Sequence, residues 1–267
     1  LKQNTSEDAV IASWWDYGYW ITTLGERTTI VDNATLIDWQ IKKMAFSLIS
    51  TPEDAWHILN SDYSTDISKY LGDETILAFG GELQSDFEKR YFEENGESCK
   101  PIFKADAQSL GIEQVTCNPL VKGMDADYVI IQVIGERFST PSTDLFLYTL
   151  EGGGDESKKA WMSMISNHQI SKFVQSDGIT PTPYFIENST LGKLIPFSII
   201  KYAEPNTGKT FDEYQDGLIP VYVKHVQYQD PENDPFFLVY ASPSFFSQEE
   251  GVMSAVLIYK INSDYKF

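Results

Sequence analysis

The hydrophobic pattern of the first 60 residues predicts short helices around one strand. Residues 5–8 (TSED) are typical of a helix start, and we expect a short helix from there to the aromatic stretch 13–20. The β-branched run 28–31 predicts a buried strand. Residues 35–48 carry a capping pair and apolar positions at helical spacing. In residues 51–59 an N-cap threonine precedes a proline, which predicts a second helix.

Residues 61–123 break this pattern, because most of them are polar and irregular. Within the block, ETILAFG predicts a strand and SDFEKRYFEENG predicts an acidic helix. We interpret the block as an insertion into the core.

Regular patterns return at residue 125. The run 128–134 is nearly continuous in apolar β-formers, which is typical of a central strand with both faces covered, and TDLFLYTL predicts a second strand. After three glycines, DESKKAWMSMI predicts a helix with Asp155 as its N-cap. From Ile179 onward, β-rich runs alternate with turn residues: PYFI, PFSIIKYA, LIPVYVKHVQY, FFLVYAS and SAVLIYKI.

These patterns predict an α+β fold. We expect a helical and mixed core over residues 1–177, with the insertion at about 61–123, and a β-rich part over 178–267 packed on that core. The chain starts without Met, so we expect it to be a piece of a longer protein.

Charge excludes some partners. The chain has 20 basic and 39 acidic residues, a formal net charge of -19, which repels nucleic acid and anionic lipid headgroups. No apolar run reaches the ~18 to 20 residues that span a bilayer.

Two observations bear on the compartment. Cys99 and Cys117 have a spacing that suits a local disulfide, although two thiols in a reduced protein would have the same spacing. Asn4, Asn33 and Asn188 each begin an Asn-X-Ser/Thr triplet, which is compatible with glycosylation of an exported protein.

The usual catalytic patterns are missing from the sequence. His57, His168 and His225 are few and scattered, so we predict no metal site here, and there is no HExxH, CxxC pair, GxSxG or P-loop. We expect the histidines to be surface or hydrogen-bonded side chains.

The aromatic stretch SWWDYGYW allows two interpretations. Trp14 and Trp15 could pack as core while Asp16 caps a helix, or the indole N–H groups and the carboxylate could together bind a hydroxyl. Such a pocket would favour a Ser or Thr side chain. We expect Gly18 to allow a sharp turn after it.

A second stretch allows a similar choice. Asp155, Lys158 and Met162 are spaced at i, i+3 and i+7, so they share one helical face and could line a wall. In the alternative interpretation they are an N-cap, a solvated lysine and a core methionine.

Together the two stretches resemble a known family. WWDYG, followed by ERTTIVDNAT, is similar to the signature of the catalytic subunit of oligosaccharyltransferases (STT family), and Asp155-x-x-Lys158-x-x-x-Met162 fits its DxxKxxxM "DK" motif. Further similarity at KMAFSLISTPEDAWHIL, DADYVII, FFLVYAS and VLIYKIN extends the resemblance over most of the chain outside 61–123. The chain resembles the soluble C-terminal globular domain of the archaeal AglB type.

The resemblance implies a Ser/Thr pocket that binds the hydroxyl two residues after the acceptor asparagine. It implies that Trp14, Trp15 and Asp16 contact the hydroxyl and that Met162 packs near a threonine methyl group. Tyr17 and Gly18 would shape the turn. Asp155 and Lys158 would support the pocket wall.

The resemblance also places the chemistry elsewhere. In the family, a divalent metal (Mn or Mg) and the catalytic acids lie in the transmembrane domain, so we expect no catalytic residue and no cofactor in this chain, and no glycan transfer by it alone. The implied partners are an acceptor polypeptide with Asn-X-Ser/Thr, a lipid-linked oligosaccharide and the chain's own transmembrane domain. The implied location is the extracytoplasmic face of the cell membrane.

A different class of function stays open. An extracytoplasmic carbohydrate-binding module would also place aromatic rings beside a carboxylate, and a cell-surface structural domain would bury residues 14–17 as core. The DK spacing distinguishes the first of these, because a carbohydrate-binding module does not need Asp155, Lys158 and Met162 on one face.

Overall fold

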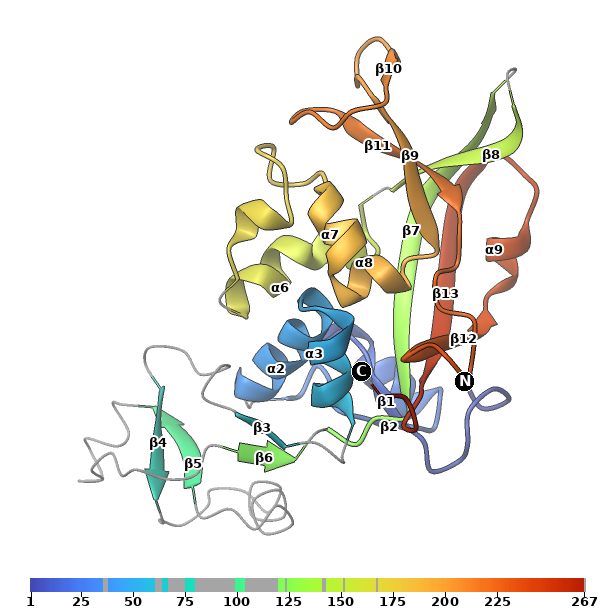
Figure 1. Cartoon of the computed structure of the whole chain (residues 1–267). Coiled ribbons are helices and arrows are strands. Elements are labelled where there is room, and N and C mark those ends of the chain that lie inside the picture. Colours follow the sequence, from blue (N-terminus) through green and yellow to red (C-terminus); the bar gives the residue numbers. More distant parts are fainter. Residues whose placement is uncertain are drawn as a thin grey trace.

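The fold is built around one long strand, β7 (Tyr128–Thr140), which runs through the middle of the molecule (Figure 1). As its apolar run predicts, both faces of this strand are covered. Val129, Ile131 and Val133 lie in a large buried cluster, while Tyr128 and Ile130 lie in a smaller one on the opposite face.

The computed structural model describes most of the chain outside the predicted insertion. The described residues are 1–35, 38–60, 64–66, 75–79, 99–103, 120–122, 124–140, 143–150, 152–166 and 168–266. The strand predicted in ETILAFG is confirmed as β4 (Thr75–Phe79), which pairs with β5 (Cys99–Phe103). The predicted acidic helix and the Cys99–Cys117 disulfide lie outside what the structure describes.

The main sheet is mixed. Its strand order is β10-β9-β11-β8-β7-β1-β2, and β13 pairs with β7 and β12 off this path. β1 runs parallel to β7 and β2, whereas β8 and β13 run antiparallel to β7. Besides β7, the strands of this sheet are β1 (Val10–Ala12), β2 (Thr28–Thr29), β8 (Thr143–Leu150), β9 (Phe197–Ala203), β10 (Thr210–Phe211), β11 (Ile219–Lys224), β12 (Phe236–Ala241) and β13 (Gly251–Ile261). A separate pair joins β3 (Ser64–Asp66) to β6 (Leu120–Lys122).

The described strands leave one edge of β7 unpaired over its middle. β13 pairs with β7 from Tyr128 to Arg137 on one edge. On the other edge, β1 pairs only up to Val129, and β8 pairs only from Gly135 onward. The chain segments that follow β1 and β8 therefore both start beside the same unpaired stretch of backbone.

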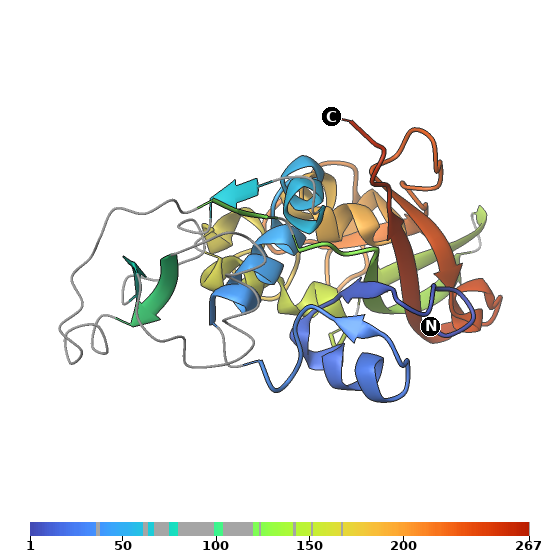
Figure 2. The same ribbon diagram turned by 90° about the horizontal axis from the view of Figure 1, so that it is seen from below.

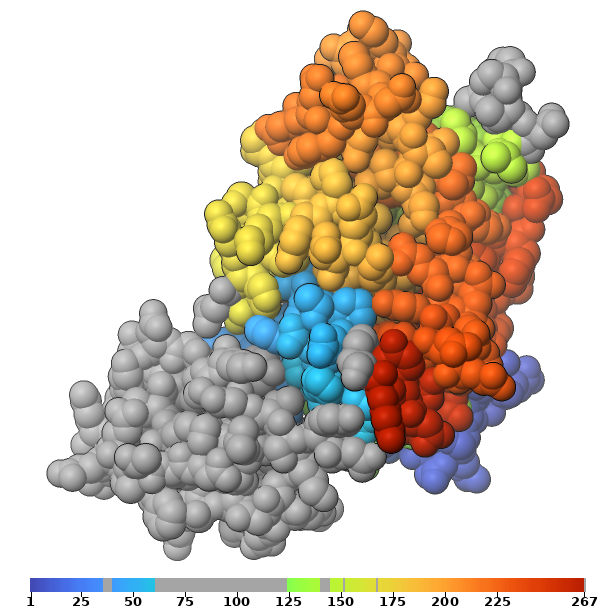
Figure 3. Space-filling view, in the orientation of Figure 1, coloured from blue at the N-terminus to red at the C-terminus, as the bar shows by residue number. Residues whose placement is uncertain are grey.

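Helices cover the face of the sheet that carries the larger cluster (Figures 1 and 2). Figure 3 shows that α2 and α3, in blue, form a continuous surface with residues 160–195, in yellow and orange. These helices are α2 (Asp38–Ile49), α3 (Pro52–Leu59), α6 (Lys159–Ile165), α7 (Pro183–Asn188) and α8 (Thr190–Leu194). The shorter helical elements are η1 (Trp15–Tyr17), α1 (Gly18–Thr23), η3 (Asp155–Lys158), η4 (Ile170–Lys172) and α9 (Pro243–Phe246).

Several predicted elements are confirmed. Helix α3 begins after Thr51, whose hydroxyl accepts a hydrogen bond from the Asp54 N–H. The strand predicted at 28–31 forms over Thr28–Thr29 as β2, but it is not buried, since Thr28 is exposed and Thr29 half-buried at the end of the sheet order. β8, β9, β11, β12 and β13 also match predicted runs.

Two predicted elements are wrong. The helix expected from residues 5–8 does not form, because Val10–Ala12 pairs with β2 and β7, and the Val10 N–H donates to the Asp127 carboxylate. The run PYFI forms helix α7 instead of a strand. Thr182 caps it by accepting from the Phe185 N–H, and Pro183 occupies its first turn.

The α+β fold class is confirmed. The strands on both sides of residues 177/178 belong to one sheet, and the domain boundary expected there stays a prediction. No helix among the described residues is both long and apolar enough to cross a membrane.

Candidate functional site

The unpaired edge of β7 brings the two sequence motifs together. One residue, Ser13, separates the end of β1 from WWDYG, and the DK segment begins five residues after the last residue of β8. Both strands flank the same gap. The backbone of Gly154 packs into this gap, since a Cβ there would lie 2.9 Å from the Gln132 carbonyl oxygen and 2.9 Å from the Ile134 nitrogen.

The Lys158 ammonium group joins the motifs. Its Nζ lies 2.7 Å from Asp16 Oδ2, 3.0 Å from the Tyr17 hydroxyl and 3.7 Å from Asp155 Oδ1. It also lies 4.5 Å from the centre of the Tyr17 ring. Its three N–H donors thus face three oxygens, two of them from carboxylates. The solvated lysine of the alternative interpretation is therefore wrong, because only 19% of this side chain is exposed.

Asp155 does not cap its helix. Gly154 occupies the N-cap position, and Asp155 Oδ2 accepts instead from the backbone N–H of Gln132 at 2.8 Å. Its Oδ1 is buried and has no hydrogen-bond partner among the described residues. Burial raises the pKa of Asp155 to about 6, against the opposing effects of the Gln132 N–H and the Lys158 charge. The N-cap predicted from sequence is wrong because the unpaired strand N–H takes this carboxylate.

Tyr17 is held from both sides. Its hydroxyl accepts from Lys158 and donates to Gln132 Oε1 at 3.1 Å. Burial and the Asp155 carboxylate raise the pKa of Tyr17 well above its usual range, so it stays a neutral donor. Sequence reasoning missed Gln132. Its signal is a single polar residue inside the apolar run VIIQVIG.

Three polar groups of WWDYG remain open. Asp16 caps no helix, 35% of its side chain is exposed, and no described residue hydrogen-bonds to its Oδ1. The indole N–H groups of Trp14 and Trp15 have no hydrogen-bond partner among the described residues. The Trp14 side chain is only 5% exposed and packs in the core cluster, as the packing interpretation predicts, whereas Trp15 is half-buried. The two rings lie 6.3 Å apart at 57°. Two donors and one acceptor on adjacent residues are thus unpaired, and of these the Trp15 N–H and Asp16 Oδ1 belong to side chains that are partly exposed.

Met162 and Gly18, the two other residues of the predicted pocket, differ from the open groups. Met162 is fully buried in the same cluster as Trp14, so its contact with a threonine methyl group stays a prediction. Gly18 has ordinary helical backbone angles, φ -56° and ψ -43°, and the sharp turn expected there is wrong. Glycine is needed because the backbone of Val31 and Asp32 packs directly against it.

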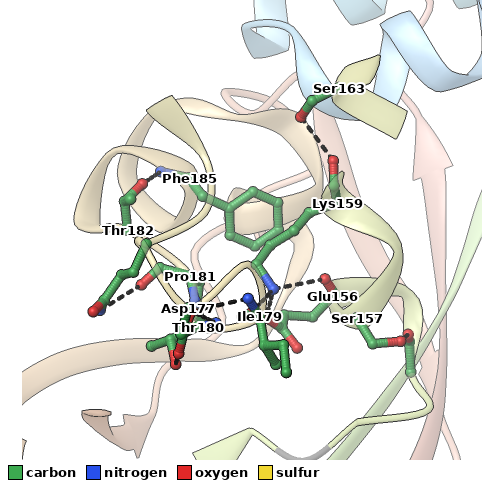
Figure 4. A network of polar contacts seen from close by, with 12 residues as sticks. Glu156, Ser157, Lys159, Ser163, Asp177, Ile179, Thr180, Pro181, Thr182 and Phe185 are labelled. Atoms are coloured by element: carbon green, nitrogen blue, oxygen red, sulfur yellow. Dashed lines mark hydrogen bonds and ion pairs between the residues drawn. The ribbon is translucent and has the colours of Figure 1, made fainter. Parts of the chain in front are cut away.

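A buried ion pair anchors the DK segment from behind (Figure 4). Lys159 points inward, with Nζ 2.5 Å from Glu156 Oε1 and a further hydrogen bond to the Ile179 carbonyl oxygen. Burial raises the pKa of Glu156, against the charge of Lys159. Adjacent lysines therefore have separate roles, since Lys158 faces WWDYG and Lys159 fixes the segment to the loop before α7.

The remaining candidates lie elsewhere. His57 lies in α3, while His168 and His225 lie in two separate loops, and the described residues hold no group of three His, Cys, Asp or Glu side chains that could bind a metal. Asn4, Asn33 and Asn188 are exposed, but Thr190 of the last triplet is buried and donates to the Ser50 carbonyl oxygen. Glycosylation at all three stays a prediction.

Comparisons with known proteins identify relatives of part of the chain. No family model matches it. It is 49% identical over 61 residues to subunit STT3B of the dolichyl-diphosphooligosaccharide–protein glycosyltransferase of Arabidopsis thaliana, covering 23% of this chain and 8% of that protein. It is 34% identical over 112 residues to subunit STT3 of the Dictyostelium discoideum enzyme, covering 36% of this chain and 15% of that protein.

One solved structure is also similar, the C-terminal domain of C. jejuni PglB. It has a TM-score of 0.33 at 11% identity, with 97% of this chain and 96% of that chain covered. A score this low does not inform the fold. The sequence matches show that part of this chain is similar to oligosaccharyltransferase subunits, of whose length the matched segments span 8% and 15%.

We predict that Gly18→Ala destabilises the chain. The new Cβ would lie 2.5 Å from Asp32 Cα, and such overpacking costs about 1–3 kcal/mol, which outweighs the gain of up to about 1 kcal/mol from alanine in a helix. Urea unfolding measures the change. Gly152→Ala is the matched control, because nothing lies within 4 Å of its Cβ position. Equal stability of both variants would contradict the close approach.

We predict that Lys159→Met lowers the free energy of unfolding by about 3–5 kcal/mol, because it leaves Glu156 buried without its partner. The double variant Glu156→Gln/Lys159→Met should recover part of this loss. Lys201→Met, at an exposed position of β9, is the control and should change stability by no more than about 0.5 kcal/mol. If Lys159→Met behaves like the control at pH 7, the ion pair does not hold the segment.

Proposed function

We propose that this chain is the globular domain of an oligosaccharyltransferase, which transfers a lipid-linked oligosaccharide to Asn in Asn-X-Ser/Thr. In this proposal the domain recognises the hydroxyl at the +2 position of the acceptor. Trp14, Trp15 and Asp16 bind it, and Asp155 and Lys158 hold Asp16 in place. The observation that carries the proposal is the 2.7 Å contact between Asp16 and Lys158, which joins the two motifs beside three open polar groups.

The open groups match the chemistry of a hydroxyl. A Ser or Thr side chain both donates and accepts, and here Asp16 Oδ1 could accept while an indole N–H donates. Because Asp16 Oδ2 is already bound to Lys158, the carboxylate would present Oδ1 in a fixed direction. A site that hydrogen-bonds a hydroxyl rejects residues that lack one, since its own polar groups are then left unpaired.

The transfer chemistry itself belongs to other parts of the proposed enzyme. We propose that a divalent metal, Mn or Mg, is held by the transmembrane domain, and that this chain alone transfers no glycan. The relatives' names supply the other partners, an acceptor polypeptide and a lipid-linked oligosaccharide. The archaeal AglB type and a location on the extracytoplasmic face of the membrane complete the proposal, and both rest on the family resemblance of the sequence alone.

We predict that Asp16→Ala in the full-length enzyme lowers transfer to an Asn-X-Thr peptide by roughly 10- to 100-fold, the value of a hydrogen bond to a charged group. Met162→Ala should lower the preference for Thr over Ser, since a threonine methyl group would lose a contact. The assay compares peptides with Thr, Ser and Ala at +2, with Asp8→Ala, an exposed carboxylate, as the matched control.

Two outcomes would contradict the proposal. If Asp16→Ala and Asp8→Ala give the same rate and the same Thr to Ser ratio, this site does not bind the hydroxyl. Glycan transfer by the isolated 267 residues would contradict the proposal that the transfer chemistry lies in other parts of the enzyme.

A second function is favoured by one specific observation. Tyr19 and Trp20 on α1 are 58% and 59% exposed and lie edge to face, 5.8 Å apart, as in surfaces that stack on sugar rings. A carbohydrate-binding module would lose glycan binding on Trp20→Ala and would be insensitive to Asp16→Ala. An oligosaccharyltransferase domain would instead lose recognition of Asn-X-Ser/Thr peptides on Asp16→Ala and would keep it on Trp20→Ala.

A further inference from the structure

One residue outside both motifs connects them. Gln132 lies in the middle of β7, beside the gap in the sheet, and makes three hydrogen bonds. Its backbone N–H donates to Asp155, its Oε1 accepts from Tyr17, and its Nε2 donates to the Ser254 hydroxyl of β13 at 3.3 Å. It therefore touches the WWDYG segment, the DK segment and the neighbouring strand at once.

The amide oxygen of Gln132 fixes the direction of the Tyr17 hydroxyl. A phenol has one hydrogen to donate, and Gln132 Oε1 accepts it at 3.1 Å. A lone pair of the Tyr17 hydroxyl oxygen then faces Lys158, whose Nζ lies 3.0 Å from that oxygen. Without this acceptor, the hydroxyl turns its hydrogen toward the nearby Asp155 carboxylate, and the ammonium group loses a partner in its present orientation.

The effect reaches Asp16 through Lys158. The ammonium group is held between the Tyr17 hydroxyl and Asp16 Oδ2, so a shift on the tyrosine side changes its distance to the carboxylate. The contact between Asp16 Oδ2 and Lys158 fixes the carboxylate group, and thereby the direction in which the unpaired Oδ1 points. The chain of contacts runs from the sheet to the ligand-facing oxygen in three hydrogen-bonded steps.

We propose that Gln132 is a positioning residue of the hydroxyl-binding site, where it sets the orientation of Asp16 through Tyr17 and Lys158. This inference rests on the function proposed above. The packing of the strand does not require the amide, since Gln132 is only half-buried and sits in an apolar run. Its backbone bond to Asp155 survives any substitution, so a variant isolates the side chain.

The test measures transfer kinetics in the full-length enzyme with an Asn-X-Thr peptide. Gln132→Met keeps the length of the side chain and removes the acceptor. We expect KM to rise roughly fivefold, the value of one neutral hydrogen bond, with kcat changed by less than about twofold. Tyr17→Phe should give the same shift. The double variant should be no worse than Tyr17→Phe alone, because both act through one contact.

The controls separate this inference from the proposed function. Gln169→Met replaces an exposed glutamine and should leave KM unchanged. If Gln132→Met leaves KM unchanged while Asp16→Ala lowers transfer, the positioning role alone is wrong. The positioning role is also wrong if the double variant Tyr17→Phe/Gln132→Met raises KM by the product of the two single increases. If Asp16→Ala has no effect, both proposals fall.

Folding is checked on the same variants. Unfolding of each purified chain should give the wild-type midpoint within a few degrees. If Gln132→Met does not fold, Gln132→Val replaces it, since valine also lacks the acceptor and suits a strand. An unchanged KM for Gln132→Val would then overturn the inference.

Discussion

The site depends on the backbone N–H of Gln132, which lies on an edge of β7 where none of the described strands pairs. A buried strand must have its backbone groups paired, and here β1 ends before this position while β8 pairs only beyond it. The Asp155 carboxylate takes the place of a strand carbonyl. This side-chain acceptor anchors the DK segment beside the end of β1. It also buries an acid, whose pKa rises to about 6.

The buried acid explains the position of Lys158. A carboxylate without solvent needs a nearby cation, and Lys158 lies 3.7 Å from its free oxygen. The same ammonium group then reaches Asp16 and Tyr17, so the requirement of the fold and the proposed binding of a hydroxyl use one charge. Stability and recognition are therefore coupled in this account, while the neighbouring Lys159 serves the fold alone.

Local signals predicted much of this from sequence. Continuous apolar runs predicted β7 and β8, and the Thr-Pro cap predicted α3, because these signals lie within the element itself. The patterns of residues 10–12 and of PYFI predict the wrong element, because β2 and β7 pair with the first segment and a Thr-Pro cap starts a helix in the second. For the site, spacing put Asp155 and Lys158 on one face. It could not reveal Gln132 or the loss of the N-cap, since both follow from where two strands end.

The coupling energy between Asp16 and Lys158 tests most directly whether this charge pair joins the two motifs. Urea unfolding at pH 7 of the wild-type chain, Asp16→Asn, Lys158→Met and the double variant gives it as a double-mutant cycle. The account predicts a favourable coupling of about 1 kcal/mol, as expected for a partly buried, hydrogen-bonded ion pair. Single effects that add to within about 0.3 kcal/mol would contradict it, because the two motifs would then not be joined by this charge pair.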